Sequence, residues 1–349
     1  MANSEVSIII LNYNQSDYTL GCLKSLNTQS YTDFEVILVD NGSKDKSYLE
    51  EARKHKFVKV VENKTNMGFA GGNNIGVEHS NGKYIVLLNN DTIVETDWLK
   101  ALVKAKKSQP EVGIFASSGT YSPKELPRYK TITLMCYNID LDSNLYDSDL
   151  KETFFAHGCS LIYEKSLIDL PFDDDYFIYL EDTYLGWLAR LKGYRVKIAK
   201  DSKLKHFGCM TTNNFVSGRT TFLGEKNRIM NFLIFYETKT LIKLTPYFLF
   251  SLVFHNIYDL KRVHSRIKSY IWLLSHFHSI IKKRHKIQKM RTVKDKDIIK
   301  YMSCKLFGES GKQIKNRLFK AVLLTLNKLA YLYCRSLYIR TVEFYDKSA

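Results

Sequence analysis

The sequence has 349 residues, 45% of them hydrophobic and 25% charged, which excludes disordered, collagen-like and disulfide-scaffolded classes and suffices for one large core, alone or with a smaller appended domain. Its formal net charge of +16 is concentrated at one end, because residues 221–349 carry 26 Lys and Arg but 8 Asp and Glu, whereas residues 1–220 carry 26 and 28. The basic end needs an anionic partner, which lipid headgroups, nucleic acid or a phosphorylated substrate could provide.

The first half of the chain alternates short, β-branched apolar runs with segments suited to helices. We expect strands at Val6–Leu11, Phe34–Val39, Val58–Val61, Tyr84–Leu88 and Val112–Ala116, and helices at Asp17–Asn27, Lys44–Arg53, Gly71–His79 and Asp97–Ser108. The first apolar run is short and has no basic region before it, so it is predicted to be a strand and not a signal peptide. This alternation predicts an α/β fold with a mostly parallel sheet flanked by helices.

The rest of the chain changes character twice. Residues 117–150 lack periodicity and are expected to form a loop-rich excursion across the sheet edge. Phe154–Ile162 and Arg195–Ala199 are strand-like, with an acidic, partly helical stretch between them, and beyond about residue 220 the pattern predicts helices. The six cysteines are scattered without a CxxC pair, which argues against structural zinc and fits reduced thiols in a cytosolic compartment.

Polar residues stand directly after three of the predicted strands, where open α/β sheets bind ligands. In LLNNDT, the Asp91 carboxylate follows two amides and suits a Mg²⁺ or Mn²⁺ ion shared with substrate phosphates, although Asn and Asp also favour ordinary turns. In VDNGS, Asp40 could accept hydrogen bonds from a base or a ribose, or serve only in a turn or helix cap. The first strand ends in Asn12, Tyr13 and Asn14.

A glycine-rich segment, Asn66–Gly76, lies before or within a predicted helix. Glycine permits close backbone approach to a phosphate or sugar, but tight packing of a helix on a sheet explains the same composition. The segment is not GxGxxG and does not follow the first strand, which argues against a nicotinamide fingerprint.

Two acidic residues, Glu181 and Asp182, stand at a predicted helix start. An ionised Asp there could be a general base, or no more than a cap stabilised by the helix dipole. The apolar Leu185, Leu188 and Leu191 at helical spacing are expected in the core. His206 follows a strand-like run and could be a structural residue or a ligand.

The segments VSIIILNYNQ, VDNGS, NMGFAGGNN, LLNNDT, LED and KHFG occur in the order and approximate spacing of family 2 glycosyltransferases. The chain most resembles the rhamnosyltransferase-like branch that builds bacterial and archaeal surface polysaccharides, over about residues 5–210. The resemblance implies a GT-A fold in residues 1–218, with a Rossmann-like nucleotide-sugar half (about 1–116) and an acceptor half (about 117–218). Residues 219–349 are expected, from their own pattern, to form a basic, amphipathic helical region that associates with a membrane.

The resemblance also implies residue roles. Asp40 would hold the base and ribose, Asp91 a Mn²⁺ or Mg²⁺ ion that bridges the diphosphate, and Asp182 would be the catalytic base with Glu181 as its neighbour. His206 would be a late metal or diphosphate contact. The sequence departs from the usual DxD because it reads Asn89-Asn90-Asp91, so only the last acid remains. Further residues implied at the nucleotide-sugar site are Asn12, Tyr13, Asn14, Asn41, Gly68, Phe69, Gly71, Gly72, Asn73, Asn89 and Asn90.

The implied activity is that of an inverting hexosyltransferase, with a dTDP-, UDP- or GDP-linked donor and, from the nearest branch, rhamnose as the sugar. Displacing a nucleoside diphosphate requires charge neutralisation on the leaving group, which a divalent ion supplies. It also requires a base for the acceptor hydroxyl. A single displacement inverts the anomeric carbon without a carboxylate nucleophile.

The basic end contains two apolar stretches, Thr240–Phe254 and Tyr270–Ile281, which fall short of the ~20 residues of a spanning helix. Lys and Arg flank them, a pattern typical of amphipathic helices in the headgroup layer of an anionic membrane. We therefore expect a peripheral protein at the cytoplasmic face of the cell membrane, acting on a lipid-linked glycan. A solvated basic face or a homodimer interface would produce the same pattern.

Three alternatives compete with this interpretation. A non-catalytic nucleotide-sugar scaffold tethered to a membrane would not need Asp40, Asp91 and Asp182 together. A nucleic-acid partner is suggested by charge alone, but the basic residues stand among Leu, Ile and Phe, so no nucleic acid is expected. A nucleotidyltransferase would carry a phosphate loop where this chain reads NYNQSDY.

Overall fold

The computed structural model describes residues 4–120, 129–140, 152–208, 217–306 and 317–345. The chain divides into two compact units. The first comprises Met1–Pro127, Ala156–Leu185 and Tyr194–Val216, and the second comprises Arg128–Phe155, Gly186–Gly193 and Ser217–Ala349. The expected boundary near residue 218 thus divides the chain differently, because two segments before it, 128–155 and 186–193, belong to the second unit.

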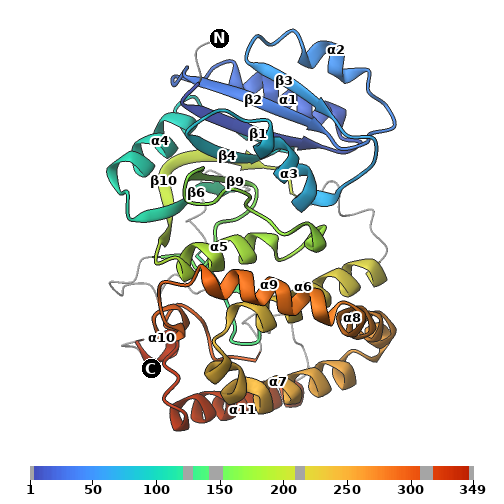
Figure 1. Cartoon of the computed structure of the whole chain (residues 1–349), viewed down its shortest axis with the longest axis vertical. Helices are drawn as coiled ribbons and strands as arrows, with labels where there is room; N and C mark the ends of the chain where they lie inside the picture. Colours follow the sequence, from blue (N-terminus) through green and yellow to red (C-terminus); the bar gives the residue numbers. More distant parts are fainter. Residues whose placement is uncertain (1–3, 121–128, 141–151, 209–216, 307–316, 346–349) are drawn as a thin grey trace. The chain divides into compact units, whose positions relative to one another are not determined.

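The first unit is built on one eight-stranded sheet in the order β3-β2-β1-β4-β9-β6-β10-β5 (Figure 1). The expected strands of the first half are confirmed, as β1 (Val6–Asn12), β2 (Phe34–Asp40), β3 (Val58–Glu62), β4 (Tyr84–Asn89) and β6 (Val112–Thr120). β1, β2, β3 and β4 are parallel neighbours. β9 (Ser160–Glu164) lies antiparallel between β4 and β6, whereas β10 (Arg195–His206) is parallel to β6 and antiparallel to β5 (Thr92–Val94).

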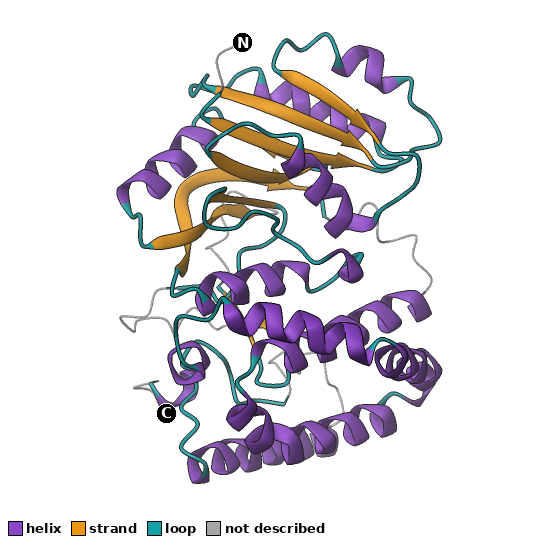
Figure 2. Ribbon diagram, in the orientation of Figure 1, coloured by secondary structure: helices purple, strands orange, loops and turns teal. Residues whose placement is uncertain are grey.

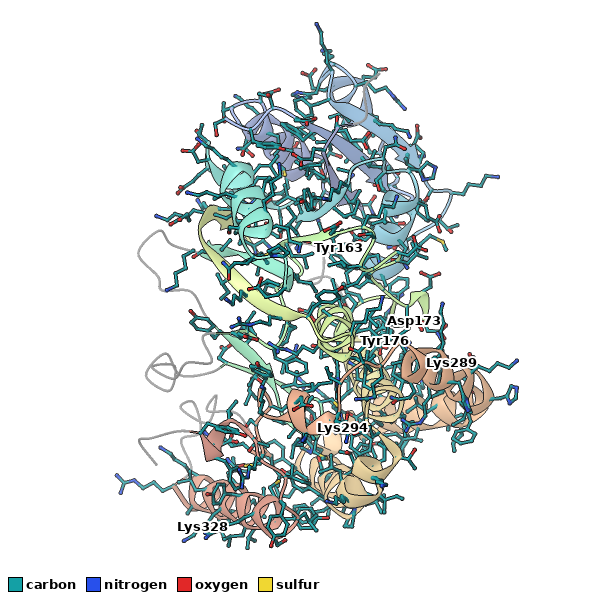
Figure 3. The ribbon with its side chains drawn as sticks, turned by 60° about the vertical axis from the view of Figure 1, so that its left-hand side comes forward. Tyr163, Asp173, Tyr176, Lys289, Lys294 and Lys328 are labelled. Carbon is teal, nitrogen blue, oxygen red and sulfur yellow. The ribbon has the colours of Figure 1, made fainter. Side chains whose placement is uncertain are left out.

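Helices cover both faces of this sheet because its central strands are apolar on both sides. On one face, Val6, Ile8 and Ile10 of β1 pack in a core with α1 (Ser16–Leu26), α2 (Tyr48–Ala52) and α4 (Trp98–Ser108). On the other face lies α3 (Gly68–Glu78), where a Cβ on Gly76 would stand 2.3 Å from Cγ2 of Ile9. Tyr163 of β9, labelled in Figure 3, is fully buried in this unit.

Two expectations about the later strands are wrong at their edges. The strand expected at Phe154–Ile162 begins only at Ser160, because the carbonyls of Thr153 and Phe154 accept hydrogen bonds from the buried guanidinium of Arg190. β10 continues to His206, and along its last part the buried Ser202 and Leu204 alternate with the exposed Lys203 and Lys205. This alternation is that of a strand with one solvated face, although its charges favour a loop from sequence alone.

The second unit is mainly helical, as expected, with α6 (Ser217–Phe235), α7 (Thr238–Tyr258), α8 (Val263–Ser275), α9 (Phe277–Lys289), α10 (Asp295–Ile299) and α11 (Arg317–Ser336) (Figure 2). It also holds a two-stranded hairpin of β7 (Lys130–Ile132) and β8 (Asn138–Asp140), in the region expected to be loop-rich. Its core includes Trp187, which stacks on Phe235 at 4.9 Å. In the described parts of the chain, no helix is long and apolar enough to cross a membrane.

Candidate active site

A cavity of about 310 Å³ lies in the first unit at the carboxyl ends of the parallel strands. In the register of the sheet, Asn12 at the end of β1 stands opposite Asp40 of β2, and Leu11 stands opposite Asn89 of β4. The chain runs from β1 outward to β2 and β3, then returns to place β4 on the other side of β1. Ligands of open α/β sheets bind at such a change of direction.

The structure brings ten of the sixteen predicted site residues together around this cavity. They stand at the last residue of a strand, in the loop after a strand or at the start of a helix, and they are Tyr13, Asn41, Gly68, Phe69, Asn89, Asn90, Asp91, Glu181, Asp182 and His206.

Asp91 and His206, the two predicted metal ligands, are neighbours in the cavity wall. Oδ1 of Asp91 lies 3.0 Å from Nε2 of His206. They meet because β5, which follows Asp91, pairs antiparallel with the end of β10, so that His206 stands opposite Thr92, and the Phe207 N–H donates to the Asp91 carbonyl at 3.0 Å. Asp91 is 7% exposed, and within the described chain its Oδ1 receives no hydrogen bond.

This donor set fits a hard divalent cation. One carboxylate oxygen and one imidazole nitrogen face the same cavity, and Mg²⁺-type ions are commonly held by one or two protein groups together with substrate phosphates and water. Among the described residues, no group of three or more His, Cys, Asp and Glu side chains surrounds a possible ion.

Glu181 and Asp182 begin α5 (Glu181–Leu191), as predicted, and both line the cavity. Glu181 is 8% exposed, and its Oε2 has no hydrogen-bond partner in the described part of the chain. Burial, with a smaller contribution from the negative Asp182, raises the pKa of Glu181 from 4.5 to about 8. Asp182 is less buried and accepts from the Thr183 N–H at 2.7 Å.

The segment before α5 forms part of the cavity wall in a strained conformation. Phe177, Tyr179 and Leu180 have φ of 57°, 75° and 63°, which non-glycine residues rarely adopt. The carbonyl of Phe177 accepts from the Phe69 and Ala70 N–H groups, at 2.6 and 3.1 Å. These bonds join the segment to the first turn of α3 and hold the strained backbone in place.

Gly68, the first residue of α3, makes this junction possible. Its φ is +76°, and a Cβ built on it would lie 2.5 Å from the Phe177 carbonyl oxygen. Asn41 supports the same turn, because its side chain donates to the Gly68 carbonyl at 3.0 Å and accepts from the Met67 N–H at 3.0 Å. The Gly68 position therefore requires glycine for contact with the protein itself.

Six predicted residues are not among those that line the cavity: Asn12, Asn14, Asp40, Gly71, Gly72 and Asn73. The Asp40 carboxylate is fully buried and accepts from Tyr48 Oη at 2.8 Å and the Ser43 N–H at 3.0 Å. A Cβ on Gly72 would stand 2.4 Å from Cδ1 of Leu11. The Asp40 carboxylate thus holds a turn, which was one of the two roles that the sequence allowed for it. Gly72 permits close packing of α3 on the sheet.

Eight residues line the cavity without having been predicted. They are Leu11, Asn66, His157, Gly158, Cys159, Phe177, Ile178 and Tyr179. Asn66 belongs to the glycine-rich segment and Leu11 ends the first apolar run, so both were adjacent to a recognised signal. Residues 157–159 and 177–179 carry none, because their approach depends on how β9 and the strained segment fold back onto the parallel strands.

Known proteins resemble this chain in sequence and in fold. The model for the family described as Glycosyl transferase family 2 matches residues 7–170. The chain is similar to an uncharacterized glycosyltransferase of Haemophilus influenzae, with 28% identity over 210 residues that cover 55% of this chain and 64% of that protein. The chain therefore spans less than two thirds of the length of this curated relative.

Two solved structures are similar in fold. S. aureus TarS 1-349 in complex with UDP-GlcNAc has a TM-score of 0.51 at 18% identity, covering 82% of this chain and 90% of that one. A mannosyltransferase from Pyrobaculum calidifontis, in complex with GDP-Man and Mn²⁺, has a TM-score of 0.51 at 16% identity, covering 83% and 84%. The expected GT-A fold is thereby confirmed.

Proposed function

We propose that the chain transfers a sugar from a nucleoside diphosphate sugar to a hydroxyl group of a glycan, because residues 7–170 match the model of the family described as Glycosyl transferase family 2. The observation that carries this proposal is the joint presence of Asp91, His206 and Asp182 in one cavity at the strand ends. The ligands named for the two similar structures, UDP-GlcNAc and GDP-Man, are nucleotide sugars and support the donor class.

Asp91 and His206 are proposed to hold a Mn²⁺ or Mg²⁺ ion. When bound, such an ion neutralises the charge that develops on a departing diphosphate. The raised pKa of Glu181 supports this role, because it disfavours a further negative charge in the cavity that would oppose the approach of the negatively charged diphosphate.

Asp182 is proposed to be the catalytic base. The acceptor hydroxyl oxygen forms a bond to the anomeric carbon while the bond from that carbon to the diphosphate oxygen breaks, and the leaving group departs with the electron pair. The hydroxyl proton passes to the Asp182 carboxylate. One such displacement inverts the anomeric configuration and requires no covalent intermediate.

The nucleoside is proposed to lie against Tyr13 and Asn41, which line the cavity beside the ends of β1 and β2. Asp40 would act indirectly, because both of its carboxylate oxygens are engaged by Ser43 and Tyr48. Its contribution would be to fix the turn from which the Asn41 side chain reaches Gly68.

The helical unit is proposed to bind an anionic membrane surface, which would bring the enzyme to a lipid-linked acceptor. On α8, the exposed Ile267, Ile271 and Leu274 recur at helical spacing, and the exposed Lys268 accompanies them. Apolar residues flanked by cations are typical of helices that lie in the headgroup layer.

The direct test is release of nucleoside diphosphate from dTDP-, UDP- and GDP-sugars with Mn²⁺ and a glycan acceptor. We expect one nucleotide class to be turned over by the full-length chain, with product of inverted anomeric configuration by NMR. Binding of a nucleotide sugar without turnover of any donor, with soluble and lipid-linked acceptors alike, would favour a non-catalytic scaffold instead.

A further inference from the structure

A second cavity, an open groove of about 270 Å³, lies in the helical unit between α7 and α11. It is lined by Pro246, Tyr247, Phe250, Leu306, Leu326, Leu329, Ala330 and Tyr333. The two tyrosine hydroxyls are already engaged, because Tyr247 donates to the Cys304 carbonyl at 2.8 Å and Tyr333 donates to the Lys243 carbonyl at 2.6 Å. The cavity therefore presents carbon surface, and its volume exceeds the ~150 Å³ of an apolar cavity that holds benzene.

Exposed apolar side chains continue from this groove along both helices. Phe250 and Leu329 line it while remaining 45% and 56% exposed, and next to them Leu249 and Leu332 are 54% and 46% exposed. Further along α7, Val253 is 59% exposed. Both helices that line the groove thus carry further exposed apolar side chains, which a long hydrocarbon chain could cover.

The charged residues of α7 and α11, the two helices that line the groove, all have one sign. Neither Thr238–Tyr258 nor Arg317–Ser336 contains an Asp or a Glu, whereas the two helices together carry Lys239, Lys243, Arg317, Lys320, Lys328 and Arg335. Lys328, labelled in Figure 3, is exposed and directly precedes Leu329 in the sequence. An apolar groove between two helices whose Lys and Arg residues are not accompanied by Asp or Glu matches a molecule with a hydrocarbon chain and an anionic head.

We propose that this groove binds one acyl chain of an anionic phospholipid, with the phosphate of the headgroup at the surrounding Lys and Arg side chains. The proposal deepens the membrane association proposed above by assigning a single-lipid site to α7 and α11. A second copy of the chain is a poorer occupant. Pairing this face with itself would bring the Lys and Arg residues of two copies together without Asp or Glu residues on α7 or α11 to balance them.

The test uses the whole 349-residue chain and a soluble probe, so that it does not depend on membrane binding. The probe is lysophosphatidylglycerol with a photoreactive diazirine in its acyl chain, kept below its micelle-forming concentration. Mass spectrometry then locates the labelled residues. We expect the label on groove-lining residues of α7 and α11, with competition by unlabelled lysophosphatidylglycerol but not by glycerol phosphate.

Two substitutions at exposed groove positions, Leu329→Glu and Phe250→Glu, are expected to reduce this labelling about tenfold or more, the factor that burying one large apolar side chain contributes. Leu274→Glu is the matched control, because Leu274 is 75% exposed on α8 and outside the groove. Its labelling is expected to equal that of the unsubstituted chain. Circular dichroism of each of the three variants is the check that it is folded.

Two results would overturn the proposal. Label distributed over exposed apolar residues of α8 as well as α7 and α11, and insensitive to Leu329→Glu, would mean that the groove has no lipid site. If Leu329→Glu instead converts a dimer to a monomer in sedimentation velocity while labelling is unchanged, the groove is an interface between copies. Sedimentation with phosphatidylglycerol vesicles tests membrane association separately, since α8 can bind them with the groove unused.

Discussion

Oδ1 of Asp91 and Nε2 of His206 lie 3.0 Å apart, although the two residues belong to distant segments of the chain. The antiparallel pairing of β5 with the last residues of β10 creates this relationship. A carboxylate and an imidazole at this distance form an ion pair when the imidazole is protonated, or share one cation when it is neutral. The proposed mechanism requires the second arrangement during turnover.

Replacement of Asp182 by Asn should abolish sugar transfer while leaving donor binding within about twofold of the unsubstituted chain. The amide keeps the size of the side chain but cannot accept the acceptor proton, and general base catalysis contributes about 10²–10⁴-fold. Transfer rate and donor affinity are measured by product formation and by calorimetry. Full transfer activity in Asp182→Asn would assign the base to another residue.

Glu181 makes the stability of the fold depend on pH. Its pKa is near 4.5 when the chain is unfolded and about 8 in the folded protein, so between these values the folded state retains a proton that the unfolded state has lost. Its contribution to stability is therefore complete below about pH 4.5 and is lost as the pH rises toward about 8. We expect the melting temperature to fall over this range, and to fall less in Glu181→Gln.

The control for this prediction is Glu78→Gln, at an exposed position of α3, which should leave the pH profile of the melting temperature unchanged. Equal profiles for Glu181→Gln and the unsubstituted chain would show that Glu181 ionises normally in the fold.

Gly68→Ala should destabilise the protein and Gly224→Ala should not. The first substitution places a Cβ 2.5 Å from the Phe177 carbonyl at a φ of +76°, a strain that costs about 1–3 kcal/mol in the free energy of unfolding. At Gly224, within α6, no described atom lies within 4 Å of an added Cβ, and Ala is favoured over Gly in a helix by about 0.5–1 kcal/mol. Urea unfolding measures both changes, and a stable Gly68→Ala variant would argue against the packed junction.

Tyr48→Phe tests whether Asp40 acts through the turn that it holds. Loss of the Tyr48 hydroxyl leaves a fully buried carboxylate oxygen without its 2.8 Å donor, at a cost of about 1–3 kcal/mol. Because the same turn carries Asn41, we expect Tyr48→Phe and Asp40→Asn to weaken donor binding by similar factors in calorimetry. A loss confined to Asp40→Asn would mean that Asp40 itself contacts the nucleotide.

Local signals were sufficient for the strands that place the site. Asn12, Asp40 and Asn89 each end an uninterrupted apolar run, and parallel strands bring such ends to one edge. The sequence could not decide whether Gly72 approaches a phosphate or a strand, because either requires a residue without a side chain; in the fold it faces Leu11. The cavity residues around Cys159 and Phe177 were not predictable, since antiparallel β9 and a strained turn bring them there through non-local contacts.

The most direct test of the proposed donor site is calorimetric binding of dTDP-, UDP- and GDP-sugars, with and without Mn²⁺. It compares the unsubstituted chain with Asp91→Ala and His206→Ala, and uses Asp201→Ala at an exposed position of β10 as control. The proposed mechanism predicts that one nucleotide class binds only with Mn²⁺, that Asp91→Ala and His206→Ala each lose this binding, and that Asp201→Ala retains it. Equal affinity with and without Mn²⁺, unchanged in Asp91→Ala, would contradict the metal-assisted donor site.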